Sequence, residues 1–143
     1  TLVIIGEGNE RATLAKLANG DGRIHLLGHR KNVAGFLQNL DLFVSSSREE
    51  PFGLAILEAM EVGIPVISTR TEGPGEFLRS HPVSLIESQA VHALAAELSK
   101  VLQEIPGGGK RRINYDMTEF SQSTGVKKVL DFYHDVRAVR EPE

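Results

Sequence analysis

Short apolar runs alternate along the chain with segments in which apolar residues recur at helical spacing. The apolar runs predict strands at residues 2–6, 24–27, 42–44, 64–68 and 83–86. The helical spacing predicts helices at residues 9–18, 33–40, 54–62, 89–105 and 123–140. Pro106-Gly-Gly-Gly109 is predicted to end the fourth of these helices. Strands that alternate with helices are typical of βαβ units, so we expect an α/β fold whose parallel sheet has helices on both faces.

Several polar or glycine-rich segments follow directly after predicted strands. They are Gly6–Gly8, Gly28–Arg30, Ser45–Glu50 and Ser68–Gly75. In open parallel sheets, ligands bind beyond the carboxyl ends of the strands. These four segments are therefore the first places to look for a site.

The segment that starts at Glu50 has the features of an anion site. Pro51 suits the first turn of a helix, so Glu50 is expected just outside the helix N-terminus. The amides of Phe52, Gly53 and Leu54 would then point outward, where they and the helix dipole favour negative charge. Two interpretations of Glu50 stay open, because it could bind a ligand or simply be a favourable charge near a helix start.

The helix after Glu50 is apolar on almost every side between Leu54 and Val62, which predicts a buried helix. Glu58 lies within it, although glutamate is rarely buried without a partner. Glu58 is therefore expected either to line a site or to share a narrow solvent edge with Glu61, three residues further on.

The run Glu50-Pro-Phe-Gly-Leu-Ala-Ile-Leu-Glu58, followed by Gly63-Ile-Pro-Val-Ile67, resembles the E-x7-E signature of retaining GT-B glycosyltransferases of the group 1, or family-four, type. The three strands predicted before it resemble those that precede this signature, in the same order. The resemblance implies that residues 1–143 form a single Rossmann-like, nucleotide-sugar-binding domain. This domain would be the C-terminal half of a GT-B fold, with the acceptor domain of the parent enzyme absent from the chain.

The resemblance also implies roles for the residues of the signature. Glu50 would be the catalytic residue and would contact hydroxyls of the donor sugar, and Glu58 would accept hydrogen bonds from the nucleotide ribose. A carboxylate can bind both hydroxyls of a cis-diol, which suits the second role. Phe52, Gly53 and Leu54 would offer backbone amides to the sugar and phosphate oxygens.

Two earlier loops complete the donor site that the resemblance implies. Gly6 and Gly8 would form a tight turn beside the donor, and Gly28, His29 and Arg30 would lie against the nucleotide base. The first loop begins like the dinucleotide fingerprint G-x-G-x-x-G, but Arg11 occupies the place of the third glycine, which argues against NAD or FAD. The second loop could instead be a surface loop whose following helix is capped by Asn32.

Composition narrows the class of protein further. The chain has 143 residues, 41% of them hydrophobic and 24% charged, the balance of one globular domain. A net charge of −3 does not favour a nucleic-acid partner. The chain has no cysteine, which excludes disulfides and is compatible with the cytoplasm, where the full-length protein could be peripheral to the inner face of the membrane. The chain contains no D-x-D motif, and its histidines lack metal-ligand spacing, so we expect no metal and no cofactor.

Three departures from the family pattern are visible. Where the family has V-G-G-x-x-E after the fourth strand, the chain has Arg70-Thr-Glu-Gly-Pro-Gly-Glu76, and the family's next segment, G-x-L-V-x-P, is replaced by residues 80–86. The family's basic pair for the diphosphate and its acceptor domain would lie upstream of Thr1, which opens almost directly into a strand. The chain therefore resembles a cut fragment that is inactive by itself.

The expected function is that of the donor domain of a retaining hexosyltransferase that binds a nucleotide-activated sugar, with UDP as the favoured nucleotide. The acceptor would be a glycan or a lipid-linked glycan, in cell-envelope polysaccharide or lipopolysaccharide synthesis. Two alternatives are a non-catalytic nucleotide-binding module and a sugar-nucleotide epimerase of GT-B architecture. The presence of both carboxylates, Glu50 and Glu58, argues against each alternative.

Overall fold

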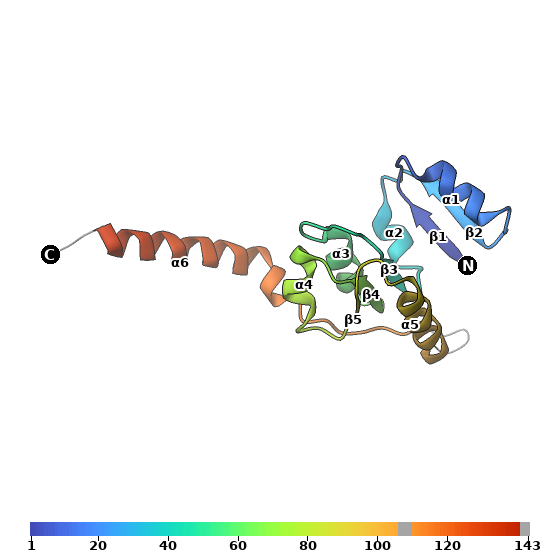
Figure 1. Cartoon of the computed structure of the whole chain (residues 1–143). Coiled ribbons are helices and arrows are strands. Elements are labelled where there is room, and N and C mark those ends of the chain that lie inside the picture. The colour runs from blue at the N-terminus through green and yellow to red at the C-terminus, as the bar shows by residue number, and fades with distance from the viewer. Residues whose placement is uncertain (106–109, 141–143) are drawn as a thin grey trace. The chain divides into compact units, whose positions relative to one another are not determined.

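The structure, a computed structural model, describes residues 1–105 and 110–140 (Figure 1). The chain divides into two compact units, one of residues 1–36 and one from Leu37 onward, and each is described by itself. That the whole chain acts as one domain stays a prediction. The predicted helix stop at Pro106-Gly-Gly-Gly109 lies outside the described residues.

The first unit is built on two parallel strands joined by a helix. Strand β1 (Leu2–Ile5) leads into helix α1 (Arg11–Ala18) and then strand β2 (Ile24–Gly28), and helix α2 (Val33–Leu37) follows. Leu2 pairs with Ile24, and the register shifts at the end of β1, where Ile5 pairs with Gly28. No residue of α1 is buried, and Leu17, on the apolar face of the predicted helix, is 75% exposed.

The second unit is built on a parallel sheet in the order β3-β4-β5 among the described residues (Figure 1). Its strands are β3 (Phe43–Ser45), β4 (Val66–Thr69) and β5 (Ser84–Ile86). Its helices are α3 (Leu54–Val62), α4 (Glu72–Leu78), α5 (Val91–Glu104) and α6 (Gln122–Arg140), with a 3-10 turn, η1 (Thr118–Phe120), before the last. The prediction of an α/β, Rossmann-like fold of parallel strands with helices on both faces is confirmed.

The core of the second unit lies where α3 packs on β3 and β4. All four residues of β4 are buried, as expected for the central strand of a parallel sheet. From α3, Ile56, Ala59 and Met60 are at most 1% exposed. Their spacing of three and four residues places them on one face of the helix, so that the other face is left to solvent.

The C-terminal end of α3 is fixed by a glycine cap. Gly63 has a φ of 79° and donates its N–H to carbonyls of the last turn of α3. A Cβ at this position would lie 2.9 Å from the carbonyl oxygen of Ile113, whose own N–H donates to the Gly63 carbonyl at 2.7 Å. Tyr115 follows in the same segment and donates its hydroxyl to the Ile64 carbonyl, and burial raises its pKa to about 12. These two hydrogen bonds hold the segment from Ile113 to Tyr115 against the residues that lead into the central strand, β4.

Truncating a side chain on each of the two faces of α3 should destabilise the protein to different extents. Ile56→Ala should lower the free energy of unfolding by about 2–5 kcal/mol, because it leaves a cavity in the core. Leu54→Ala, its control on the same helix, should cost less than about 1 kcal/mol, because Leu54 is 65% exposed. Urea denaturation measures both, and equal losses would contradict the described orientation of α3.

Candidate functional site

The loops after β3 and β4 lie together at the carboxyl edge of the sheet. β3 and β4 are parallel and pair from Phe43 with Val66 to Ser45 with Ser68. Beyond this pairing, the buried hydroxyl of Thr69 donates to the Ser47 carbonyl at 2.6 Å. This hydrogen bond holds the loop that leads to Glu50 against the end of the central strand.

Glu50 is held by the backbone that follows it. Its Oε1 accepts a hydrogen bond from Gly53 N at 3.0 Å and a longer one from Phe52 N at 3.5 Å. The expectation that these two amides are free to bind an anion is therefore wrong in this structure, because both already donate to the Glu50 carboxylate. A carboxylate has a second oxygen, and the described residues donate no hydrogen bond to that oxygen of Glu50.

Pro51 does not lie in the first turn of the helix after Glu50, although proline suits that position. Helix α3 starts at Leu54, and Gly53 precedes it with a left-handed φ of 89°, so Pro51 and Phe52 lie outside the helix. Neither Leu54 N nor Ala55 N donates to an acceptor among the described residues. These are the amides that the first turn of α3 presents, and they are the groups to which an anion at a helix N-terminus binds.

Glu58 lies on the solvent face of α3, so the prediction of a helix buried on nearly every side is wrong. Leu54, Ala55, Glu58 and Glu61 are all exposed, whereas the opposite face forms the core. This is the narrow solvent edge that the sequence left open as an alternative. Exposure also makes the Glu58 carboxylate accessible to a ligand, and its role at the ribose stays a prediction.

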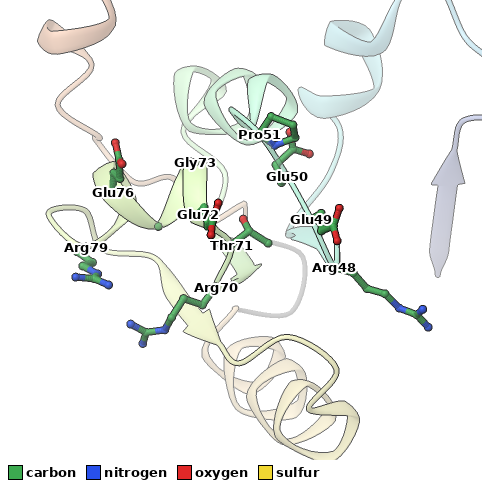
Figure 2. A pocket seen from close by; sticks show the side chains of 11 residues that line it. Arg48, Glu49, Glu50, Pro51, Arg70, Thr71, Glu72, Gly73, Glu76 and Arg79 are labelled. Atoms are coloured by element: carbon green, nitrogen blue, oxygen red, sulfur yellow. The ribbon is translucent and has the colours of Figure 1, made fainter.

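A cavity of about 870 Å³ opens on the α4 side of Glu50. Its lining comes from the loop after β3 and from the segment that runs out of β4 into α4, as Figure 2 shows. In that view Glu50, Thr71 and Glu72 lie near the centre, and Arg48 and Arg79 extend outward (Figure 2). Carboxylates and guanidinium groups together can accept from and donate to the hydroxyls of a saccharide.

Most of this lining is not predicted from the sequence. No role is predicted for Arg48, Arg70, Thr71, Glu72 or Arg79, although the segment after β4 is predicted at the carboxyl edge of the sheet. The family departure at Arg70–Glu76, where no helix is predicted, is in fact mostly the helix α4. The usable signal was Thr71, an N-cap residue type followed by an acidic first turn.

Thr71 carries an unpartnered hydroxyl at this cavity. The residue is 9% exposed, and its Oγ1 is buried with no hydrogen-bond partner among the described residues. It precedes α4 without capping it, since no side-chain hydrogen bond reaches the helix amides. A buried hydroxyl without a partner costs free energy, which is tolerated where a ligand or water can satisfy it.

The remaining predicted donor residues lie in the first unit and are described there alone. Gly6, with a φ of 133°, donates its N–H to the Gly28 carbonyl at 3.0 Å, which joins the ends of β1 and β2. Gly8, His29 and Arg30 are exposed.

Gly28 is closely packed, because a Cβ there would overlap Glu7 Oε1, and its φ is 72°. The alternative cap is confirmed, since Asn32 Oδ1 accepts a hydrogen bond from Gly35 N at 3.1 Å.

Among the side chains that the structure describes, no group of three or more histidine, aspartate or glutamate residues is placed to hold a metal ion. No helix in the same part of the chain is long and apolar enough to cross a membrane. That the reaction uses no metal or cofactor stays a prediction.

Comparison with known proteins decides the family. Residues 1–104 match the family model described as "Glycosyl transferases group 1". The chain belongs to the group 1 glycosyltransferases. In an alignment of length 142 that covers 94% of the chain, it is 30% identical to N-acetyl-alpha-D-glucosaminyl L-malate synthase of Bacillus anthracis. In an alignment of length 81 that covers 54% of the chain, it is 44% identical to the lipopolysaccharide core biosynthesis glycosyltransferase LpsE of Rhizobium meliloti. The matches span 37% and 24% of these two relatives.

Solved structures resemble the chain as well. TarM matches with a TM-score of 0.62 and 29% identity, over 71% of this chain and 21% of TarM. Anabaena HepE in complex with UDP matches with a TM-score of 0.63 and 25% identity, over 73% of this chain and 31% of HepE. The chain therefore corresponds to a minor part of each of these two longer proteins.

The two threonines at the carboxyl end of β4 should respond differently to removal of the hydroxyl. Thr71→Val should raise the free energy of unfolding of the free protein by up to about 1 kcal/mol, because it removes an unpartnered buried hydroxyl without changing the shape. Thr69→Val should lower it by about 1–2 kcal/mol, because it leaves the Ser47 carbonyl unpaired. Urea denaturation measures both variants, and a large loss in Thr71→Val would show that its hydroxyl has a partner in the protein.

Proposed function

We propose that this chain is the donor-binding part of a retaining glycosyltransferase that uses a nucleotide-activated sugar, with a UDP-sugar as the favoured donor. The observation that carries the proposal is the order of groups along α3. Glu50 lies before the helix, the amides of Leu54 and Ala55 lie at its N-terminus, and Glu58 follows on the exposed face. Glu58 is four residues beyond Leu54, about 6 Å along the helix axis.

This order matches the order of groups in a nucleotide sugar. The ribose would bind at Glu58, the diphosphate at the amides of Leu54 and Ala55, and the transferred sugar at Glu50 and the cavity beside it. Two further observations support the assignment. HepE structures exist with UDP and with UDP-glucose, and LpsE, by its name, acts in lipopolysaccharide core synthesis.

The residues of the chain would act mainly by electrostatics and positioning. When the bond between the anomeric carbon and the diphosphate oxygen breaks, negative charge grows on the leaving diphosphate. Amides that are already aimed at this position, such as those of Leu54 and Ala55, stabilise that charge without reorganisation. Glu50 would hold the sugar through its hydroxyls and serve as the catalytic carboxylate facing the anomeric centre, in line with its expected role.

The acceptor is proposed to bind outside this chain, which spans 37% of one relative and 24% of another. We propose a glycan or a lipid-linked glycan of the cell envelope as acceptor, and a cytoplasmic enzyme that can work at the inner face of the membrane. Two alternatives, a non-catalytic nucleotide-binding module and a sugar-nucleotide epimerase, would use the same edge of the sheet. Sugar transfer to a glycan by the full-length protein would exclude both.

The two exposed glutamates of α3 provide a matched test of the ribose site. In calorimetric titrations of the chain with UDP, GDP and ADP, we expect selective binding of UDP. Glu58→Ala should weaken it about tenfold or more, because a hydrogen bond to a charged group is lost. Glu61→Ala removes the same charge from the same face and should leave the affinity within about twofold. Equal effects of the two substitutions would contradict the ribose role of Glu58.

The chain by itself is expected to bind donor weakly and to transfer no sugar. The physical reason is that the acceptor site and the basic groups for the diphosphate are proposed to lie elsewhere in the full-length protein. A coupled assay for UDP release in the presence of acceptor glycans measures this. Robust sugar transfer by the isolated chain would contradict the proposal that the acceptor site and the basic groups for the diphosphate lie outside it.

A further inference from the structure

The loop that carries Glu50 and the first turn of α4 fit together through two reciprocal contacts between glycine and proline. A Cβ on Gly73 would overlap the carbonyl group of Pro51 and would lie 3.0 Å from the carbonyl oxygen of Glu50. A Cβ on Gly53 would lie 2.7 Å from Cγ of Pro74. The backbone carbonyl of Pro51 therefore occupies the space beside Gly73, and the ring of Pro74 occupies the space beside Gly53. Figure 2 shows Glu50 and Pro51 beside the start of α4.

This packing bears directly on the carboxylate of Glu50. The carbonyl groups of Glu50 and Pro51 lie in the space that a side chain at position 73 would fill. The pyrrolidine ring of Pro51 also fixes the backbone φ of that residue. Gly53, with its left-handed backbone, turns its N–H toward Glu50 Oε1 at 3.0 Å. The backbone on both sides of the carboxylate is thus held from α4, an element that Glu50 itself does not belong to.

A second glycine of α4 shows that the close approach is specific to one position. Gly75 lies two residues after Gly73 in the same helix, and neither has a positive φ. The nearest atom to a Cβ on Gly75 would be Cγ of Arg70 at 4.0 Å, an ordinary contact. Alanine is otherwise favoured over glycine inside a helix, so alanine at position 75 is tolerated and alanine at position 73 is not.

We infer that Gly73 and Pro74 are positioning residues for Glu50, which set where its carboxylate meets the sugar of the donor. The inference rests on the proposed function for the part that concerns sugar binding. A misplacement of about 1 Å in a positioning group can cost about a hundredfold in rate, so a single added methyl group at position 73 is enough to matter.

The first test observes the carboxylate without any ligand. Glu50→Gln should move the amide resonance of Gly53, because the Gly53 N–H donates to that carboxylate. The same substitution should move this resonance equally in a Gly75→Ala background, and it should have little effect in a Gly73→Ala background. A Gly73→Ala protein in which Glu50→Gln still moves the Gly53 resonance by the wild-type amount would overturn the inference.

The second test separates positioning from a general structural role. Affinities for UDP-glucose and for UDP are measured side by side, since only the first ligand carries the sugar that Glu50 is proposed to contact. Gly73→Ala should weaken UDP-glucose about tenfold, toward the affinity for UDP, and should leave UDP within about twofold. Equal weakening of both ligands would indicate a merely structural role and would overturn the inference.

Two further arrangements keep these tests decisive. If Gly73→Ala does not fold, Pro74→Ala serves instead, because it removes the ring that faces Gly53 without adding an atom. Its loss of affinity for UDP-glucose is expected to be smaller than tenfold, again with little change in the affinity for UDP. If wild-type chain binds UDP and UDP-glucose equally, the proposed role of Glu50 at the sugar fails. The Gly53 resonance still decides whether Gly73 positions the carboxylate.

Discussion

The site depends on one hydrogen bond, from the backbone N–H of Gly53 to the carboxylate of Glu50. A glutamate side chain has several rotatable bonds and would lose conformational entropy each time it bound a ligand. The hydrogen bond holds Oε1 of Glu50 in place before any ligand binds, and the other carboxylate oxygen is the one proposed to meet the donor sugar. It requires a left-handed residue at position 53, and the first turn of α4 has to come close enough to hold that backbone in place.

The position of α3 between core and solvent follows from the same arrangement. Its buried face, with Ile56, Ala59 and Met60, anchors the helix on the central strand. Its exposed face is left with two apolar residues, Leu54 and Ala55, and with Glu58. Exposed apolar surface beside free amides and a carboxylate is suited to a ligand that has both apolar ring faces and charged groups. A helix that presents such a face while it is anchored on a parallel sheet would be a stable platform for the proposed nucleotide sugar.

Much of the fold could be predicted from the sequence, because the strands and most helices have a clear period. The interval from Leu54 to Val62 was predicted to the residue, and the alternation of strands and helices gave the parallel sheet. The place of Pro51 was predicted wrongly, because proline suits a first turn, whereas the left-handed Gly53 leaves Pro51 outside the helix. α4 was missed, because glycine and proline within Glu72–Leu78 are typical of loops, and here close packing requires them.

The candidate site was only partly predictable, for a physical reason. The apolar count of α3 does not tell which face meets the sheet, so the sequence left two interpretations of Glu58 open and could not decide between them. The hydrogen bond from the Gly53 amide to Glu50 depends on the conformation of the loop, which the spacing of apolar residues along the chain does not predict. Thr71 and Gly73 come from a segment that departs from the family pattern, so their contribution appears only in three dimensions.

The most direct test of the central claim is to map which part of the donor touches which residue. Saturation-transfer difference NMR of UDP-glucose with the chain reports the glucose and ribose protons separately. The account predicts that Glu50→Gln reduces the signals of the glucose protons alone, and that Glu58→Gln reduces those of the ribose protons alone. Signals that fall together in both variants, or ribose signals that depend on Glu50, would contradict the proposed order of the donor along α3.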